Sequence, residues 1–385
     1  MPNPIGPLTA GDEWFRHQIV DTVAVVGTSD PSWTEKVCAM AMAKDGSLQL
    51  GFGLGKYANR NVMDCYTGIS RGKEQITIRG SRRLSDDPER MGAGPIRYEI
   101  VEPLSKIRFI CEPNDTQPIA FDWLFESVLP CSLEDRTHNR NGYRVAAELV
   151  RYHQIGVASG WVEVDGVLTE ITPETWVSTR DHSWGVRYDV GQPLADVEAT
   201  EGLGSAAFQF IWSPSLMQRK DGSRYGLFFY VADTSAPGFS QRQTSSFMEH
   251  PDGTVTRFTD VVQDFSYDPN NRRLQGGYLH CTLEDGSTRS LKVDVLGDTG
   301  FHLGAGLYFG YNGHHHGEWR GPLVVEGERI SDCTLRENAV KLHQIRDTAV
   351  RITDEVEGAV GYGNMQPIAY GDFPHLGLDG ATSFM

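Results

Sequence analysis

Apolar side chains in this chain recur mainly at every second position, the spacing that places them on one face of a β-strand. Ile119, Phe121, Trp123 and Phe125 alternate with other residues, and the run 291–295 repeats the pattern. Alternation of this kind predicts strands that bury one face and expose the other.

Asp-Gly and Asn-Gly pairs recur between these runs, and such pairs tolerate the positive φ angles of tight hairpin turns. They begin, among other places, at Asp45, Asn141, Asp165, Asp221, Asp252 and Asp285. Helical spacing is confined to short segments around 58–66 and 143–153, whereas a parallel α/β fold needs regular crossover helices. We therefore expect an all-β protein of antiparallel barrels or sandwiches with few short helices.

Two domains are expected. The length of 385 residues is too great for one ordinary core and suits two. Between 189 and 206 the sequence is rich in Gly, Ala, Pro and acidic residues and poor in large apolar ones. We place the boundary there, which gives an N-terminal β domain of 1–195 and a C-terminal β domain of 196–385.

Acidic residues outnumber basic ones, 51 to 35, and the formal net charge is −16. This excess repels nucleic acids and anionic membrane surfaces, so neither is expected as a partner. A few buried arginines could still form a local cationic site for an anionic substrate.

The start of the chain and its cysteines favour a cytoplasmic protein. The first thirteen residues lack the basic and apolar regions of a secretion signal, and the longest apolar stretch nearby, 37–43, is far too short for a membrane span. The six cysteines are scattered without a CxxC pair, which is typical of reduced, mostly buried thiols. No membrane insertion is expected.

The densest group of chemically versatile side chains lies in the segment 180–188. In a strand, Arg180, His182 and Trp184 face one way and Asp181 faces the other. His182 could act as a general acid or base, because an imidazole titrates near neutrality. Trp184 could stack on an unsaturated or aromatic ligand. A structural corner, with a buried Trp and an Arg–Asp pair that ties strands together, explains the same residues.

The residues 181–185, Asp-His-Ser-Trp-Gly, resemble the Asp-His-x-Trp-Gly signature of the carotenoid 1,2-hydratase (hydroxyneurosporene synthase) superfamily. Its members are tandem lipocalin-like proteins, and fungal cyclases of the Diels–Alderase type are distant relatives. The longer string 180–187, with 160–166 and 317–328, is similar to a bacterial branch that is frequent in organisms that degrade aromatics and terpenoids. The resemblance implies two lipocalin-like barrels in tandem.

The resemblance also implies a site where the two barrels meet. His182 and Trp184 would line it, and an acidic residue from a later strand would donate the proton. Apart from the resemblance, we expect Asp181 and Arg180 to hold the imidazole in position. The hydratases carry a Tyr-x-Asp partner downstream, but this chain has Phe-Gln-Phe at 208–210. This departure separates the chain from carotenoid hydration itself and leaves the acid unassigned.

Aromatic side chains are dense in 208–212 and 227–230. Runs of this kind are more often core than ligand pocket, yet a barrel with an internal cavity must line it with such residues. The candidate substrate-binding residues are therefore, beside Arg180, the aromatic side chains Tyr188, Phe210, Trp212 and Tyr230.

The histidine run 314–316 is a further candidate. In a strand, His314 and His316 would share one face, where a third ligand could complete a zinc or iron site. The run follows an Asn-Gly pair and precedes a glycine, so an exposed turn explains it as well, and no metal is expected. Glu318 and Trp319, just beyond, are placed to face a cavity or its rim, and we count them as substrate-binding candidates.

Several common chemistries are disfavoured. The sequence has no Walker loop and no Gly-x-Ser-x-Gly elbow. The glycines of 51–55 lack the strand–turn–helix context of a dinucleotide site. No cofactor is expected.

These observations together predict a cofactor-independent lyase, of hydratase, dehydratase or related C–O/C–C bond-cleaving type. Its substrate would be an apolar aromatic or terpenoid molecule held between the domains, with His182, Asp181 and Trp184 as catalytic residues. The alternatives are a non-catalytic carrier of a hydrophobic metabolite, an isomerase or cyclase of the same fold, and a metalloenzyme that uses His314 and His316. A homodimer is left open.

Overall fold

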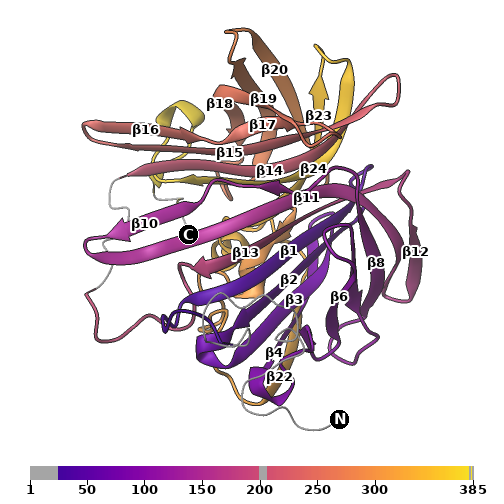
Figure 1. Ribbon diagram of the computed structural model, residues 1–385, viewed down its shortest axis with the longest axis vertical. Helices are drawn as coiled ribbons and strands as arrows, with labels where there is room; N and C mark the ends of the chain where they lie inside the picture. The colour runs from indigo at the N-terminus through magenta and orange to yellow at the C-terminus, as the bar shows by residue number, and fades with distance from the viewer. Residues whose placement is uncertain (1–24, 199–205, 381–382, 384–385) are drawn as a thin grey trace.

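The computed structural model describes residues 25–198, 206–380 and 383, and most of this chain forms two antiparallel β-sheets, one above the other in Figure 1. The first sheet contains β1 (Trp33–Ala43), β2 (Gln49–Tyr57), β3 (Val62–Arg71), β4 (Glu74–Arg83), β5 (Gly92–Ala93), β6 (Ile96–Glu102), β7 (Lys106–Cys111), β8 (Ile119–Ser127), β9 (Ser132–Leu133), β10 (Thr137–Asn141), β11 (Arg144–Val164), β12 (Val167–Ile171), β13 (Trp176–Val186) and β22 (Leu323–Ile330). Their order is β22-β4-β3-β2-β1-β13-β11-β8-β7-β6-β5, with β9, β10 and β12 paired to β11. The sheet curls until β5 packs against β3 and β4, which forms the first barrel.

The second sheet closes on itself. It contains β14 (Ala207–Arg219), β15 (Arg224–Ala236), β16 (Phe239–Thr244), β17 (Ser246–Glu249), β18 (Val255–Tyr267), β19 (Leu274–Leu283), β20 (Thr288–Val295), β23 (Arg346–Asp354) and β24 (Ala359–Tyr370), and the short β21 (Phe301–His302) pairs with β23. The order runs β14-β24-β23-β20-β19-β18-β17-β15, and β15 pairs back to β14. The expected all-β fold of two barrel-like units in tandem is confirmed.

The alternation of the sequence appears directly in the strands. In β8, Ile119, Phe121, Trp123 and Phe125 are buried, whereas Glu126 is exposed. These side chains join others from across the first sheet in one apolar core, and the second sheet encloses a separate core. Each barrel is therefore filled with side chains.

The Asp-Gly and Asn-Gly pairs lie at hairpin turns, as expected. Asp45 and Gly46 connect β1 to β2; Gly46 has a φ of +77°, and Asp45 Oδ1 accepts a hydrogen bond of 2.9 Å from the Ser47 amide. The same aspartate-to-amide bond recurs two residues after Asp221, Asp252 and Asp285. These local bonds fix the turns independently of the cores.

The helices differ from the expectation. The described chain has one α-helix, α1 (Arg336–Leu342), and the 3₁₀ helices η2 (Ala58–Arg60), η3 (Leu84–Asp86), η4 (Leu303–Gly306) and η5 (Pro374–Leu376). The helix expected around 58–66 is only η2 followed by β3, and 143–153 belongs almost entirely to β11. That segment is a strand because β10 and β13 hydrogen-bond to it on its two sides, and tertiary pairing outweighs local propensity. The seven residues of α1 are too few to give a periodic signal.

One strand crosses the expected domain boundary. β22 lies far beyond 195 in the sequence, yet it pairs with β4 at the edge of the first sheet, as Figure 1 shows. The boundary between 195 and 196 stays a prediction, and the first barrel takes one strand from the second half of the chain.

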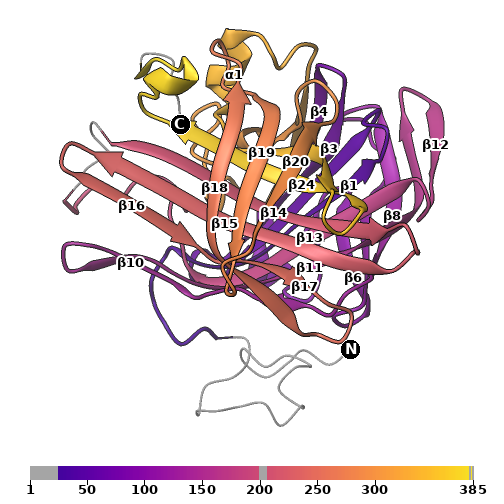
Figure 2. The ribbon, with the colours of Figure 1, turned by 90° about the horizontal axis from the view of Figure 1, so that it is seen from above.

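The outer walls of the two barrels face each other. β11 and β13 pack against β14, and β13 also packs against β24; Figure 2 shows these strands of the second sheet crossing over the first. Side chains that point outward from both barrels form a layer between them, which we call the interdomain layer. Its main members here are Cys38, Arg151 and Asp181 from the first barrel and Trp212 and Tyr230 from the second.

The thiols are as expected. All six cysteines are free, and four of them, Cys65, Cys111, Cys281 and Cys333, are buried. No helix within the described ranges is long and apolar enough to cross a membrane.

A buried histidine links the two barrels. His153 of β11 lies with Nδ1 3.2 Å from Glu134 Oε1 and Nε2 3.1 Å from Glu249 Oε1, and Glu249 belongs to the second barrel. Its ring also stacks on Phe228 at 3.9 Å between centroids. Burial alone would lower the pKa of His153, but the two carboxylates outweigh it and raise the pKa to about 9. The imidazole is therefore cationic at neutral pH, between two anions.

This linkage predicts a loss of stability at alkaline pH. Because the pKa of His153 is about 9 in the folded chain and 6.5 ordinarily, its contribution is complete below about pH 6.5 and disappears as the pH rises through 9. The loss should be at most about 3 kcal/mol, measured by urea unfolding at a series of pH values. In His153→Phe, the fall in the free energy of unfolding between about pH 6.5 and 9 should vanish. An unchanged fall in that variant would show that other groups cause it.

Candidate functional site

The strand β13 presents its side chains to two different environments. Arg180, His182 and Trp184 point into the first barrel, and Asp181 and Ser183 point out toward the second. The register agrees with this: His182 pairs with Val37, a residue of the first barrel's core, and Asp181 pairs with the outward-facing Cys38. The two neighbours Asp181 and His182 thus belong to different sites.

The inward site lies at the mouth of the first barrel. His182 Nε2 is 2.9 Å from Glu35 Oε1 and His182 Nδ1 is 3.0 Å from Tyr152 Oη. Arg180 Nη2 donates to the same Tyr152 oxygen at 3.4 Å, and the indole of Trp184 meets the His182 ring edge to face at 5.9 Å. The hydrogen bond from His182 lowers the pKa of Glu35. We call this group the barrel-mouth cluster.

This placement corrects one expectation. His182 and Trp184 share a face, but it is the inner face of one barrel and not the wall between two. The reason is the curl of the sheet, which turns the even-numbered side chains of β13 inward. Any catalytic role of His182 and Trp184 stays a prediction and would have to be exercised at the barrel mouth.

The outward site contains a carboxylate in the middle of the interdomain layer. Asp181 Oδ2 lies 3.4 Å from Arg151 Nε, and the two side chains keep 14% and 25% of their exposure although they face the second sheet. Cys38, the neighbour of Asp181 on β1, is also only partly buried. Burial raises the pKa of Asp181, against the opposing charge of Arg151. Asp181 is therefore a partly exposed acid whose pKa lies above its ordinary value.

Aromatic side chains of the second barrel form the opposite wall. Trp212 of β14 donates its Nε1 hydrogen to Glu134 Oε1 at 3.0 Å, and its ring lies 6.0 Å from the Arg151 guanidinium. Tyr230 is the partner of Trp212 on β15, and Phe210 meets Tyr230 edge to face at 5.3 Å. These three predicted binding residues lie outside the barrel's own core, so the structure brings them to the same layer as Asp181.

Two tyrosines that sequence reasoning missed complete this layer. The hydroxyls of Tyr66 and Tyr308 lie 3.7 and 3.3 Å from Cys38 Sγ. Tyr308 is partly exposed, and Lys36 Nζ lies 3.9 Å from its ring centre. The signal that could have found Tyr66 is the alternating glycine run of β2.

Aromatic rings pack directly against the glycines of β2. Gly51, Gly53 and Gly55 all face the interdomain side of the strand, and a Cβ at these positions would overlap the rings of Phe301, Tyr66 and Tyr57 respectively. Two of the rings have a second glycine against them: Gly306 for Tyr66 and Gly317 for Tyr57. The run 51–55 therefore serves close ring packing, which is consistent with its lack of a dinucleotide-site context.

The remaining predicted binding residues lie elsewhere. Tyr188 is 49% exposed, and its hydroxyl accepts a hydrogen bond of 2.8 Å from Asn139. Trp319 is 48% exposed, with the Arg83 guanidinium 5.4 Å from its ring. Glu318 accepts a hydrogen bond of 2.9 Å from the His315 amide and stabilises its own loop. The structure does not bring these three together with Asp181.

The histidine run forms a turn. His314 is bridged to Tyr311 and approaches Glu318 at 3.4 Å, whereas the buried His316 has its Nδ1 3.1 Å from Lys36 Nζ and 3.0 Å from Tyr57 Oη. Burial lowers the pKa of His316 well below its ordinary value. Within the described ranges, no group of three His, Cys, Asp or Glu side chains is arranged to hold a metal ion.

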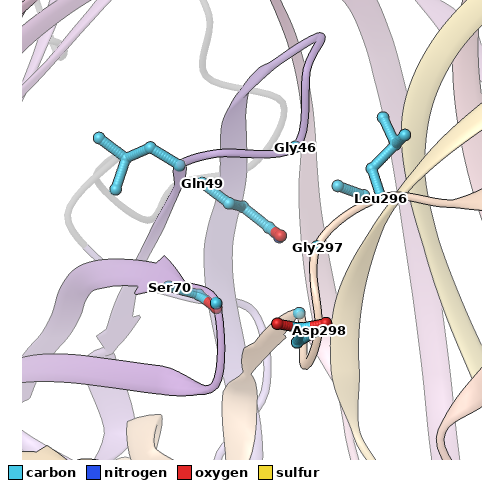
Figure 3. Close-up of a pocket in the computed structure, with 10 residues that line it drawn as sticks. Gly46, Gln49, Ser70, Leu296, Gly297 and Asp298 are labelled. Carbon is cyan, nitrogen blue, oxygen red and sulfur yellow. The ribbon is translucent and has the colours of Figure 1, made fainter.

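Two cavities lie away from these sites. The pocket in Figure 3, between Gln49, Ser70 and Asp298, has a volume of about 10 Å³, which suits about one water molecule. A larger, open hollow of about 360 Å³ is lined by Arg82, Arg83 and neighbouring residues. Neither cavity includes Asp181 or His182, so access to the interdomain layer rests on the exposure that its own residues keep.

Comparison with known proteins gives a family without an assigned activity. A model of a family of unknown function (DUF8625) matches residues 8–379. No curated protein matches the chain.

Several solved structures align with most of this chain. A protein provisionally assigned as AttH from Nitrosomonas europaea is 13% identical, with a TM-score of 0.45 over 87% of this chain and 92% of that one. CghA in complex with Sch210972 is 12% identical, with a TM-score of 0.48 over 89% and 90% of the two chains. Kievitone hydratase from Nectria haematococca is 11% identical, with a TM-score of 0.40 over 90% and 93%. The chemistry of the present site has to be inferred from its own residues.

The packing of rings against these glycines predicts that one added methyl group lowers the stability of the fold. Gly53→Ala should destabilise the chain by roughly 1–3 kcal/mol, because the new Cβ overlaps the Tyr66 ring in a packed layer. Urea unfolding measures the change. In a Tyr66→Ala background the same substitution should cost much less, since the ring is gone; an equal cost in both backgrounds would contradict the packing role.

Proposed function

The chain belongs to the DUF8625 family of unknown function, and we propose that it is an enzyme of lyase type that moves a proton to and from a small, largely apolar molecule bound in the interdomain layer. Asp181 is the proposed acid and base. The observation that carries this proposal is the position of that carboxyl, partly exposed between two barrels and opposite the aromatic wall of Phe210, Trp212 and Tyr230.

The environment of Asp181 suits proton transfer in both directions. Burial raises its pKa, whereas the charge of Arg151, 3.4 Å away, opposes that rise. A carboxyl group whose pKa is raised by burial holds its proton more readily than a surface aspartate, and a cation beside it stabilises the carboxylate once the proton has left. A fully ionised surface aspartate lacks this property.

The aromatic wall supports a substrate with an apolar, unsaturated body. Phe210 and Tyr230 are partly buried, so their rings remain open to contact. Stacking on such rings orients an unsaturated ligand and displaces water from the carboxyl beside it. An aromatic or terpenoid compound would offer a body of this kind.

A dehydration illustrates the proposed step. The carboxylate of Asp181 removes a proton from a substrate carbon, and the C–H electron pair becomes a new C=C bond as a hydroxyl departs from the neighbouring carbon. The proton then passes from Asp181 to the departing hydroxyl, which leaves as water. Electrons balance without an oxidant or reductant, so this step needs no redox cofactor; hydration is the reverse.

A second candidate places the same chemistry at the barrel mouth. The hydrogen-bonded series Glu35, His182 and Tyr152 favours it, because a histidine between a carboxylate and a phenol can relay a proton. Because Asp181 lies in the interdomain layer and His182 in the barrel-mouth cluster, substitutions at these two adjacent residues test the two sites separately.

Asp181→Asn should abolish most turnover, and His182→Gln should separate the candidates. Each purified variant is incubated in D₂O with a panel of aromatic and terpenoid ketones, alcohols and phenols, and mass spectrometry records deuterium gained at carbon and loss or gain of water. Removal of a positioned acid/base group should slow proton transfer roughly 10²–10⁴-fold, so this loss is expected in Asp181→Asn.

Other outcomes would overturn the proposal. A loss in His182→Gln alone would move the chemistry to the barrel-mouth cluster. Wild-type protein that binds panel compounds yet leaves them unlabelled and intact would be a carrier. A mass-neutral product would instead indicate an isomerase or cyclase.

A further inference from the structure

Three hydrogen-bond donors converge beside Asp181. The hydroxyls of Tyr66 and Tyr308 both approach Cys38 Sγ. Burial raises the pKa of the thiol and of both phenols, the phenols well above their ordinary value, so each group keeps its hydrogen at neutral pH. In the described part of the chain, Cys38 Sγ is the sole hydrogen-bond partner of either hydroxyl, and sulfur is a weak acceptor. An incoming oxygen atom would therefore be a better acceptor than the one present.

The two hydroxyls are held in place before any ligand arrives. The Tyr66 ring lies between Gly53 and Gly306 and meets the Tyr308 ring edge to face at 6.1 Å. Tyr308 in turn stacks on the buried His316 ring at 5.0 Å. Donors fixed in this way need no reorganisation when charge develops on a bound oxygen.

Within the described ranges, two cations beside the donors form no ion pair, although the charges of Asp64 and Asp181 act on Lys36 from a greater distance. Lys36 is buried, with Nζ 3.1 Å from His316 Nδ1 and over the Tyr308 ring. Arg187 donates to Ser183 Oγ at 2.5 Å. Among residues the structure describes, neither cation has a carboxylate within ion-pair distance. Burial accordingly lowers the pKa of Lys36 to about 8. A negative charge on a ligand would compensate these cations.

We propose that the hydroxyls of Tyr66 and Tyr308 bind a substrate oxygen that carries or develops negative charge, so that the substrate is a carbonyl compound or a phenol. This inference rests on the proposed function, because it places that oxygen next to the proton acceptor. Cys38 and Asp181 are direct cross-strand partners on one face, which sets their Cβ atoms about 5 Å apart. A carbon adjacent to the bound carbonyl would then lie within reach of Asp181.

The combined step is a dehydration of a β-hydroxy carbonyl compound. Asp181 takes the proton between the two functional groups, the C–H pair forms the C=C bond of an enolate, and the carbonyl π pair moves to the oxygen held by the two phenols. The enolate then re-forms the carbonyl and expels the β-hydroxyl, which receives the proton from Asp181. The products are an α,β-unsaturated carbonyl compound and water, with atoms and electrons balanced.

Binding of 4-nitrophenol tests this inference without turnover. At a pH where the probe is ionised, wild-type protein should bind it at least about ten-fold more tightly than 4-nitroanisole, in which the oxygen carries a methyl group. Tyr66→Phe and Tyr308→Phe remove only a hydroxyl and keep the packed ring. Each should weaken phenolate binding roughly ten- to a hundred-fold and leave 4-nitroanisole unaffected. Absorbance and calorimetric titration measure both affinities.

The control is Tyr362→Phe, a partly buried tyrosine of the second barrel that makes no bond to Cys38; its binding should match the wild type. Equal phenolate binding in wild type, Tyr66→Phe and Tyr308→Phe would overturn the inference, even where Asp181→Asn abolishes proton transfer. Conversely, Asp181→Asn should bind the phenolate at least as tightly as wild type, because a nearby negative charge is removed. Phenolate binding that needs both tyrosines, with proton transfer unaffected by Asp181→Asn, would uphold this inference and refute the proposed reaction.

Discussion

A buried imidazolium between two carboxylates sets the distance between the barrel walls. His153 projects from β11, Glu134 lies just beyond β9, and Glu249 comes from the second barrel. Buried charges tolerate little displacement, since each ion depends on the others for the solvation it has lost. Arg151 stands two residues away on the same strand and forms ion pairs with both Glu134 and Asp181, so this ion set is continuous with the carboxyl of Asp181.

Glycine determines what the layer beside this ion set can contain. Gly51, Gly53 and Gly55 alternate with Phe52 and Leu54, so β2 is apolar toward the first core and bare on the other face. Aromatic rings rest directly on the backbone there, and the hydroxyl of one of them, Tyr66, ends beside Cys38. The absence of side chains at these three glycines therefore lets the rings approach the strand closely, and this close approach fixes where the ring hydroxyl lies in the interdomain layer.

The sequence allowed the all-β class, the hairpin turns and the opposite orientation of His182 and Asp181 to be predicted, because each follows from local periodicity or turn chemistry. Which face of β13 meets the second barrel could not be predicted, since that depends on how the whole sheet curls. Tyr66 and Tyr308 lie far apart in sequence and meet only through tertiary packing. Phe210, Trp212 and Tyr230 were recognised as aromatic candidates, but their common wall emerged from the pairing of β14 with β15.

The pairing of β22 with β4 means that the first sheet cannot be completed until late in the synthesis of the chain. A ribosome that has released only the first half of the chain leaves β4 as an open edge, with unpaired amides and carbonyls available to any neighbouring strand. The missing partner emerges only after most of the second barrel has been made. During that interval the nascent chain is exposed to mispairing, and its first barrel is completed only after seven strands of the second barrel, β14 to β20, have been made.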